Sequence, residues 1–271
     1  MQDPKLKHLL EIPTISTVIY AKATYYPNFV RIYIPKEPYP KHPEGFEKPA
    51  TKGSLRTQAD ELDETDTERS IRRTRKKIKD YVLCNEFELF ATFTFKNDRQ
   101  NIDRCKTRMA DWLKNQRSRI SKFDYIIVPE FHKDKQSLHF HALFRGYKGK
   151  LVQSLNATTA QPIKQNGHNV YEIPGYTLGF TNVKIIDKNI DSQTKVGFYI
   201  QKYITKDMPL FFGKNRYWNS KGLNLPKTED NPQEWYKHIK PDREYRNDNG
   251  VILEFDKLSH PLTSIFSEAR Q

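Results

Sequence analysis

The chain has 271 residues, and its 46 Lys and Arg exceed its 33 Asp and Glu to give a formal net charge of +13. That balance favours a polyanionic partner, most simply nucleic acid, and an aromatic content of 13% suits single strands, whose bases stack on rings. Other classes are disfavoured: the two cysteines form no CxxC pair for a zinc knuckle, no apolar run approaches the ~18 residues of a membrane span, and no GxxxxGK[ST] loop indicates an ATPase. Since the N-terminus also lacks a signal-peptide pattern, we expect a soluble, cytoplasmic protein.

The first part of the chain predicts a hairpin followed by a linker. Val30, Ile32 and Ile34 alternate with other residues, as in a half-buried strand, and residues 15–24 predict a partner strand ahead of a Tyr-Pro-Asn turn. Prolines then crowd the chain, which favours an extended segment. We therefore expect residues 1–55 to form an N-terminal hairpin and a Pro-rich linker.

A long helix is predicted next, over residues 56–82. Its first half is acidic and its second half is basic, an order that suits the helix dipole. The basic half has two interpretations of equal weight, a solvated face or a surface that contacts phosphates. The residues predicted to bind DNA are Arg69, Arg72, Arg73, Arg75, Lys76 and Lys79.

The middle of the chain alternates strand and helix patterns. The predicted elements are strands over 87–95, 123–131, 138–145 and 181–186, a helix after the first strand capped by Asn97 or Asp98, and a helix from Ser192 to about Asp207. Residues 146–179 are expected to be irregular. This order predicts an α+β fold in which helices pack on one antiparallel sheet. Residues 209–271 are expected to form a C-terminal extension.

Two histidines stand one residue apart in an apolar run, Leu-His-Phe-His-Ala-Leu-Phe. In a strand, His139 and His141 project to the same face, where two neutral imidazoles make half of a divalent-metal site. Glu130 of the preceding strand reaches that face if the hairpin register pairs it with either histidine, and a register one residue off would turn it away. His132 is a further candidate. The bland interpretation is a pair of histidines hydrogen-bonded at a sheet edge.

Two tyrosines follow in the last predicted helix of this region, at positions i and i+4. Tyr199 and Tyr203 would share one helical face, and each is followed three residues later by a lysine, Lys202 or Lys206. A nearby ammonium favours the phenolate form of tyrosine, which is a known covalent nucleophile. The alternative is an aromatic stripe that packs on the sheet.

These residues together resemble the HUH endonucleases, and more narrowly the rolling-circle replication initiators of bacteriophages and plasmids. Three motifs match in order: Phe90–Phe95 is similar to motif 1, His139-Phe140-His141 to motif 2, and Tyr199 to Lys206 to motif 3. The doubled tyrosine is similar to the microvirus-type initiators. The resemblance covers about residues 87–208 and identifies residues 56–208 as the endonuclease domain with its leading basic helix.

The resemblance implies a five-stranded antiparallel sheet with flanking helices. Glu130, His139 and His141 would hold Mg²⁺ or Mn²⁺, and Tyr199 would attack a phosphate of single-stranded DNA at a hairpin replication origin to keep a 5′-phosphotyrosine. Lys202 would assist charge neutralisation, and Tyr203 could perform the second transfer. A host helicase and polymerase are the implied partners, in the cytoplasm of the bacterium that carries the phage or plasmid.

Two alternatives remain open at this point. A relaxase or transposase of a mobile element would share the chemistry and differ in biology. A non-catalytic single-stranded nucleic-acid-binding module would instead use Phe93 and Phe95 of the first strand to stack bases.

Overall fold

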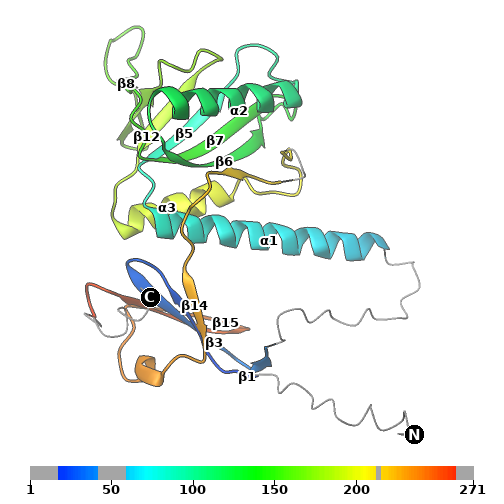
Figure 1. Ribbon diagram of the computed structural model, residues 1–271, viewed down its shortest axis with the longest axis vertical. Coiled ribbons are helices and arrows are strands. Elements are labelled where there is room, and N and C mark those ends of the chain that lie inside the picture. Colours follow the sequence, from blue (N-terminus) through cyan, green and yellow to red (C-terminus); the bar gives the residue numbers. More distant parts are fainter. Residues whose placement is uncertain (1–17, 42–58, 212–214, 261–271) are drawn as a thin grey trace, which may run out of the picture. The chain divides into compact units, whose positions relative to one another are not determined.

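The computed structural model describes residues 18–41, 59–211 and 215–260, which form two compact units. One unit runs from Thr57 to Leu225, and the other joins Met1–Arg56 to Pro226–Gln271. Both contain antiparallel sheets, and helices accompany the sheet in the larger unit, so the predicted α+β class is confirmed (Figure 1). The Pro-rich linker predicted in the first 55 residues falls largely outside the described residues.

The larger unit contains a seven-stranded antiparallel sheet where five strands were expected. Its strand order is β13-β6-β7-β5-β12-β11-β8. The bounds are β5 Leu89–Thr94, β6 Asp124–Phe131, β7 Leu138–Arg145, β8 Val152–Gln153, β11 Tyr171–Glu172, β12 Thr181–Ile185 and β13 Trp218–Asn219. Two of the additional strands, β8 and β11, come from the segment predicted to be irregular. That segment also holds a short hairpin, β9 Lys164–Gln165 with β10 His168–Asn169.

One face of this sheet packs on α2, Ile102–Arg119, as Figure 1 shows. Alternation along the strands sends Phe93 and Phe140 to that face, where Met109 and Trp112 of the helix bury them. Phe93 and Phe95 are 0% and 4% exposed, so they cannot stack bases as the alternative module required. The helix is capped by the side chain of Asn101, which accepts from the backbone N–H of Arg104, so the predicted caps at Asn97 or Asp98 were wrong.

The opposite face packs on two helices, α1 Ala59–Asn85 and α3 Ile190–Gln201. Apolar residues of both helices, among them Ile78, Val82 and Ile200, join Leu143 and Ile126 of the sheet in a second core. The long helix was therefore correctly predicted and runs slightly farther. The boundaries predicted for α3 were wrong, since it is capped by Asn189 and ends at Gln201.

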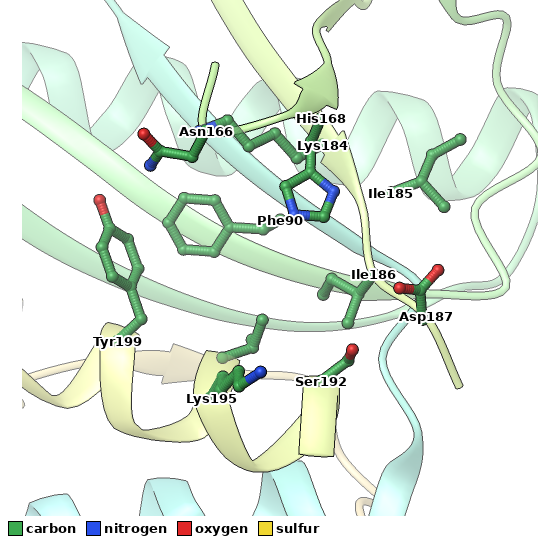
Figure 2. A pocket seen from close by; sticks show the side chains of 11 residues that line it. Phe90, Asn166, His168, Lys184, Ile185, Ile186, Asp187, Ser192, Lys195 and Tyr199 are labelled. Atoms are coloured by element: carbon green, nitrogen blue, oxygen red, sulfur yellow. The ribbon is translucent and has the colours of Figure 1, made fainter. Parts of the chain in front are cut away.

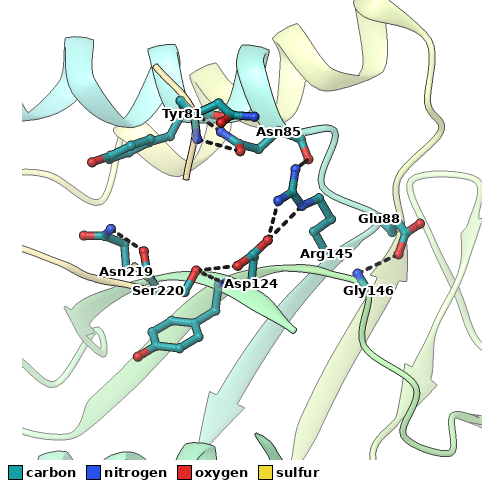
Figure 3. Close-up of polar contacts among 10 residues, drawn as sticks. Tyr81, Asn85, Glu88, Asp124, Arg145, Gly146, Asn219 and Ser220 are labelled. Atoms are coloured by element: carbon teal, nitrogen blue, oxygen red, sulfur yellow. Dashed lines mark hydrogen bonds and ion pairs between the residues drawn. The ribbon is translucent and has the colours of Figure 1, made fainter. Parts of the chain in front are cut away.

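A polar network ties the end of α1 to the edge of the sheet (Figure 3). The Asp124 carboxylate accepts from Arg145 Nε at 2.9 Å and from Ser220 Oγ at 3.0 Å. Arg145 Nη1 in turn donates to the carbonyl of Asn85 at 3.3 Å. The side chain of Asn85 exchanges hydrogen bonds with the backbone of Asn224, at 2.9 Å each. One carboxylate thus holds β6, β7 and the segment after β13 together.

Removing that carboxylate is expected to destabilise the larger unit. Asp124→Ala leaves the Arg145 guanidinium and the Ser220 hydroxyl without their acceptor, which should lower the free energy of unfolding by about 1–3 kcal/mol. Urea denaturation followed by circular dichroism measures the change. Asp111→Ala, on the exposed side of α2, is the matched control and should stay within about 0.5 kcal/mol of wild type. Equal stabilities of the two variants would contradict the structural role of the network.

The smaller unit is a five-stranded antiparallel sheet of order β14-β2-β3-β16-β15. Its strands are β2 Lys22–Tyr25, β3 Phe29–Pro35, β14 Lys227–Asp230, β15 Arg243–Asn247 and β16 Gly250–Asp256, with a separate pair, β1 Val18–Ile19 and β4 Tyr39–Pro40. The 3-10 helix η3, Glu234–Lys237, adds Trp235 and Tyr236 to a core with Phe255. The predicted terminal hairpins were found, and the structure joins them in one sheet. Within the described residues, none of the helices has the length and apolar content that a membrane span requires.

Candidate active site

The register of the β6–β7 hairpin puts the three predicted metal ligands on one face of the sheet. Glu130 pairs with His139, and Val128 pairs with His141. On the other side of β7, Thr92 of β5 pairs with His141. Because partners in register project to the same side, the Glu130 carboxylate joins both imidazoles on the face opposite α2. The register that the sequence left open is therefore the favourable one.

His141 is fixed from three directions. Its Nε2 lies 2.6 Å from Glu130 Oε2, and its Nδ1 lies 3.2 Å from the hydroxyl oxygen of Thr92. The ring of Tyr203 stacks on the imidazole with 3.6 Å between centroids and 8° between planes. Only 5% of His141 is exposed, so its orientation is set by the protein.

His139 lies at the more open end of the same face. Its ring is 4.6 Å from that of His132, centroid to centroid. Burial, followed by His132 and His141, lowers the pKa of His139, which favours the neutral imidazole that metals bind. Residues of this region line a cleft into which Glu130, Tyr203 and Lys202 also project.

The donor set of this face fits a divalent cation, because it combines two imidazoles with a carboxylate. Its present arrangement is not yet a metal cluster. Glu130 is engaged with His141 and His139 adjoins His132, and among residues 18–41, 59–211 and 215–260 no group of three His, Cys, Asp or Glu side chains is gathered to hold a metal. The structure aligns the three donors on one face without bringing them to one point.

The two tyrosines meet beside the histidines, although in a different local setting from the predicted one. Tyr199 occupies the last turn of α3, whereas Tyr203 lies in the turn beyond the helix. Their rings make an edge contact at 5.5 Å, and Tyr199 also contacts Phe90 of β5 at 5.2 Å. Tyr199 is 42% exposed. Burial, a hydrogen bond with Tyr199 and the Glu130 carboxylate raise the pKa of Tyr203.

The two motif lysines differ in their relation to the tyrosines. Lys202 Nζ lies 3.9 Å from the ring centroid of Tyr199, so its charge stands over the face of the ring. The predicted role of Lys202 was to lie near the developing phenolate, and this position keeps the ammonium within the same site. Lys206 follows in the exposed segment after Tyr203.

The basic run on α1 divides into residues that bind neighbouring elements and residues that face solvent. Arg75 Nε donates to the carbonyl of Ile204 at 3.1 Å, next to Tyr203. Lys76 pairs with Asp80 at 2.7 Å, and Lys79 Nζ lies 4.2 Å from the ring centroid of Phe198. The remaining predicted DNA-binding residues, Arg69, Arg72 and Arg73, are exposed. The contact of Arg75 had no signal in the sequence, because it joins residues 129 positions apart.

This division predicts different effects for neighbouring arginines. Arg72→Gln with Arg73→Gln should reduce the slope of log affinity against log salt by up to about 1.4, at ~0.7 per phosphate contact on a single strand. Arg75→Gln should leave that slope nearly unchanged and instead lower the unfolding free energy by about 1–2 kcal/mol, because the Ile204 carbonyl loses its donor. Fluorescence anisotropy with a labelled single-stranded oligonucleotide at several salt concentrations measures the slopes. An unchanged slope in the double variant would return the run to a solvated face.

Fold and site together define the class: an α+β unit whose sheet presents paired histidines to a pair of tyrosines. In a comparison with protein families, the model of a replication-associated protein family, the ORF2 type, matches residues 88–208. The matched segment begins at the start of β5 and includes Glu130, both histidines and both tyrosines. The similarity supports a role in DNA replication. No curated protein and no solved structure matches the chain.

Proposed function

We propose that the chain is a rolling-circle replication initiator of the HUH type, which nicks single-stranded DNA at an origin and rejoins the ends through a 5′-phosphotyrosine. The observation that carries the proposal is the stacking of Tyr203 on His141, 3.6 Å between ring centroids, with Tyr199 in contact. It brings the histidine motif and the tyrosine motif, which are far apart in the sequence, into one site. The similarity of residues 88–208 to replication-associated proteins agrees with it.

The tyrosines supply the chemistry of strand transfer. Tyr199 has the more exposed ring of the two, and its phenol oxygen attacks the scissile phosphorus while its proton is released. The P–O3′ bond breaks, the departing oxygen takes up a proton, and the product is a 5′-phosphotyrosine with a free 3′-hydroxyl that primes synthesis. Since the phosphodiester energy is retained in the new bond, a 3′-hydroxyl can reverse the step and no ATP is consumed. Tyr203 is placed to accept the strand in the second transfer.

Other residues of the site bind and neutralise the phosphate. Lys202 lies over Tyr199 and supplies positive charge where the attacking oxygen and the phosphate meet. Glu130, His139 and His141 would hold Mg²⁺ or Mn²⁺, which when bound stabilises negative charge on the scissile phosphate. Unwinding would come from a host helicase and extension from a host polymerase.

A covalent-adduct assay tests this function. The purified chain is incubated with Mn²⁺ and a labelled random-sequence pool of single-stranded oligonucleotides, so that the origin need not be specified. We expect a labelled protein band that survives denaturing electrophoresis and disappears after protease treatment. A chain that binds the pool but forms no such band with Mn²⁺ or Mg²⁺ would contradict the enzymatic function.

A further inference from the structure

A second cavity adjoins the tyrosine pair on the side of Tyr199, away from the histidine cleft. It has a volume of about 300 Å³ and is formed by β5, the end of β12, α3 and the β9–β10 hairpin (Figure 2). Tyr199 lines this cavity, whereas Tyr203 lines the cleft that contains Glu130 and His139. The two rings touch, so a strand that crosses the tyrosines would enter both hollows.

The walls of this cavity combine aromatic, apolar and cationic groups. Phe90 and Tyr199 meet nearly at right angles, 78°, and Ile186 and Val196 extend the apolar surface. Lys184 lies on the sheet face shared with Phe90, since the two residues pair in register. A half-exposed aromatic ring beside an apolar wall is a surface on which a base can stack.

Charge and polarity at the rim fit a nucleotide better than an apolar ligand. Neither Lys184 nor Lys195 forms an ion pair within the part of the chain that the structure describes, so both ammonium groups are available to an anion. Asp187 supplies a carboxylate acceptor, and Asn166 and His168 of the hairpin supply further hydrogen-bonding groups, as Figure 2 shows. Carboxylate and amide groups read the edges of bases, and lysines bind phosphate.

We propose that this cavity binds one unstacked nucleobase of single-stranded DNA, together with its phosphate, next to the phosphate attacked at the tyrosines. The base stacks on Tyr199 against the Phe90 wall, Lys184 and Lys195 bind the phosphate, and Asp187 with the hairpin residues contacts the base edge. The inference rests on the proposed function for the position of the scissile phosphate. It adds a subsite that would make cleavage depend on the identity of one neighbouring base, because only a base outside a duplex stack can enter.

Photocrosslinking tests the subsite without any cleavage. The probe is a labelled 12-mer of deoxythymidine in which 5-iodouracil replaces thymine throughout, and it is irradiated with the full chain in the presence of a chelator. The crosslinked peptide is then mapped. We expect crosslinks to Phe90, His168 or Tyr199, since 5-iodouracil reacts with aromatic rings that it contacts. Crosslinks confined to other peptides would overturn the proposal.

A charge variant supplies an independent measurement. Lys184→Gln with Lys195→Gln should lower the slope of log affinity against log salt by about 1.4, as expected for two phosphate contacts on a single strand. The matched control, Lys114→Gln with Lys150→Gln, removes the same charge from exposed positions of the same unit and should leave the slope unchanged. Identical slopes in both double variants would overturn the proposal.

Failure of the subsite and failure of the enzymatic function can be told apart. If crosslinks map to the cavity but no covalent adduct forms with Mn²⁺, the subsite is supported and the nicking activity is contradicted. If the adduct forms but crosslinks avoid the cavity, only the subsite is wrong.

Discussion

Replacing His139 and His141 together by alanine is expected to reduce covalent adduct formation by more than ~100-fold, since even residues outside the first metal shell typically cost 10–100-fold when mutated. Both imidazoles project to the face that carries Glu130, and their loss removes two of the three proposed ligands. Chelation of the wild-type protein should have the same effect, and added Mn²⁺ should restore activity to the wild type only. Adduct formation on labelled single-stranded DNA is the measurement.

The controls for this experiment follow from the burial of the site. His141 supports the ring of Tyr203, so thermal unfolding and DNA affinity must be compared with wild type before activity is interpreted. His238→Ala, an exposed histidine in the smaller unit, should leave adduct formation unchanged. Cleavage that persists in the double variant, or that survives chelation, would remove the metal from the proposal.

Replacing Tyr199 by phenylalanine is expected to abolish the first covalent adduct while DNA binding is retained. The substitution removes only the hydroxyl, and the remaining ring keeps its contacts with Phe90 and Tyr203. Tyr203→Phe should still nick, but rejoining of ends should fall, because the acceptor for the second transfer is lost. Denaturing gels combined with peptide mapping of the linked residue distinguish the two steps.

The structure gives this experiment a definite alternative outcome. Tyr203 stacks on His141 and lines the cleft of Glu130 and His139, whereas Tyr199 is the more exposed tyrosine. An adduct mapped to Tyr203 alone would reverse the ranking and make proximity to the histidines the deciding factor. An adduct at neither residue would leave both tyrosines as packing residues.

Local pattern predicted the elements of the larger unit because alternation and helical periodicity are properties of neighbouring residues. The β6–β7 hairpin and the shared face of His139 and His141 follow from a period of two, and the buried side of α2 follows from a period near four. The pairing of Glu130 with His139 did not follow, since a shift of one residue changes no local pattern.

Long-range contacts account for the errors at the site. The helix that carries Tyr199 was expected to continue to about Asp207 but ends at Gln201. The chain beyond it is bound elsewhere: Tyr203 lies on His141, and the carbonyl of Ile204 accepts from Arg75 of α1. Helix propensity does not contain such contacts, and here they determine how the second tyrosine is presented.

The shared sheet of the smaller unit has a consequence for biosynthesis. β3 pairs with β16, and Asn231 Oδ1 accepts from the backbone N–H of Tyr20, a contact between residues 211 positions apart. A growing chain therefore exposes the early strands β2 and β3 through the translation of the whole larger unit, and they find their partners only when the last strands leave the ribosome. The larger unit can fold first, during synthesis, and a transcript truncated before residue 250 would yield that unit with two unpaired apolar strands at its N-terminus, a species prone to aggregation.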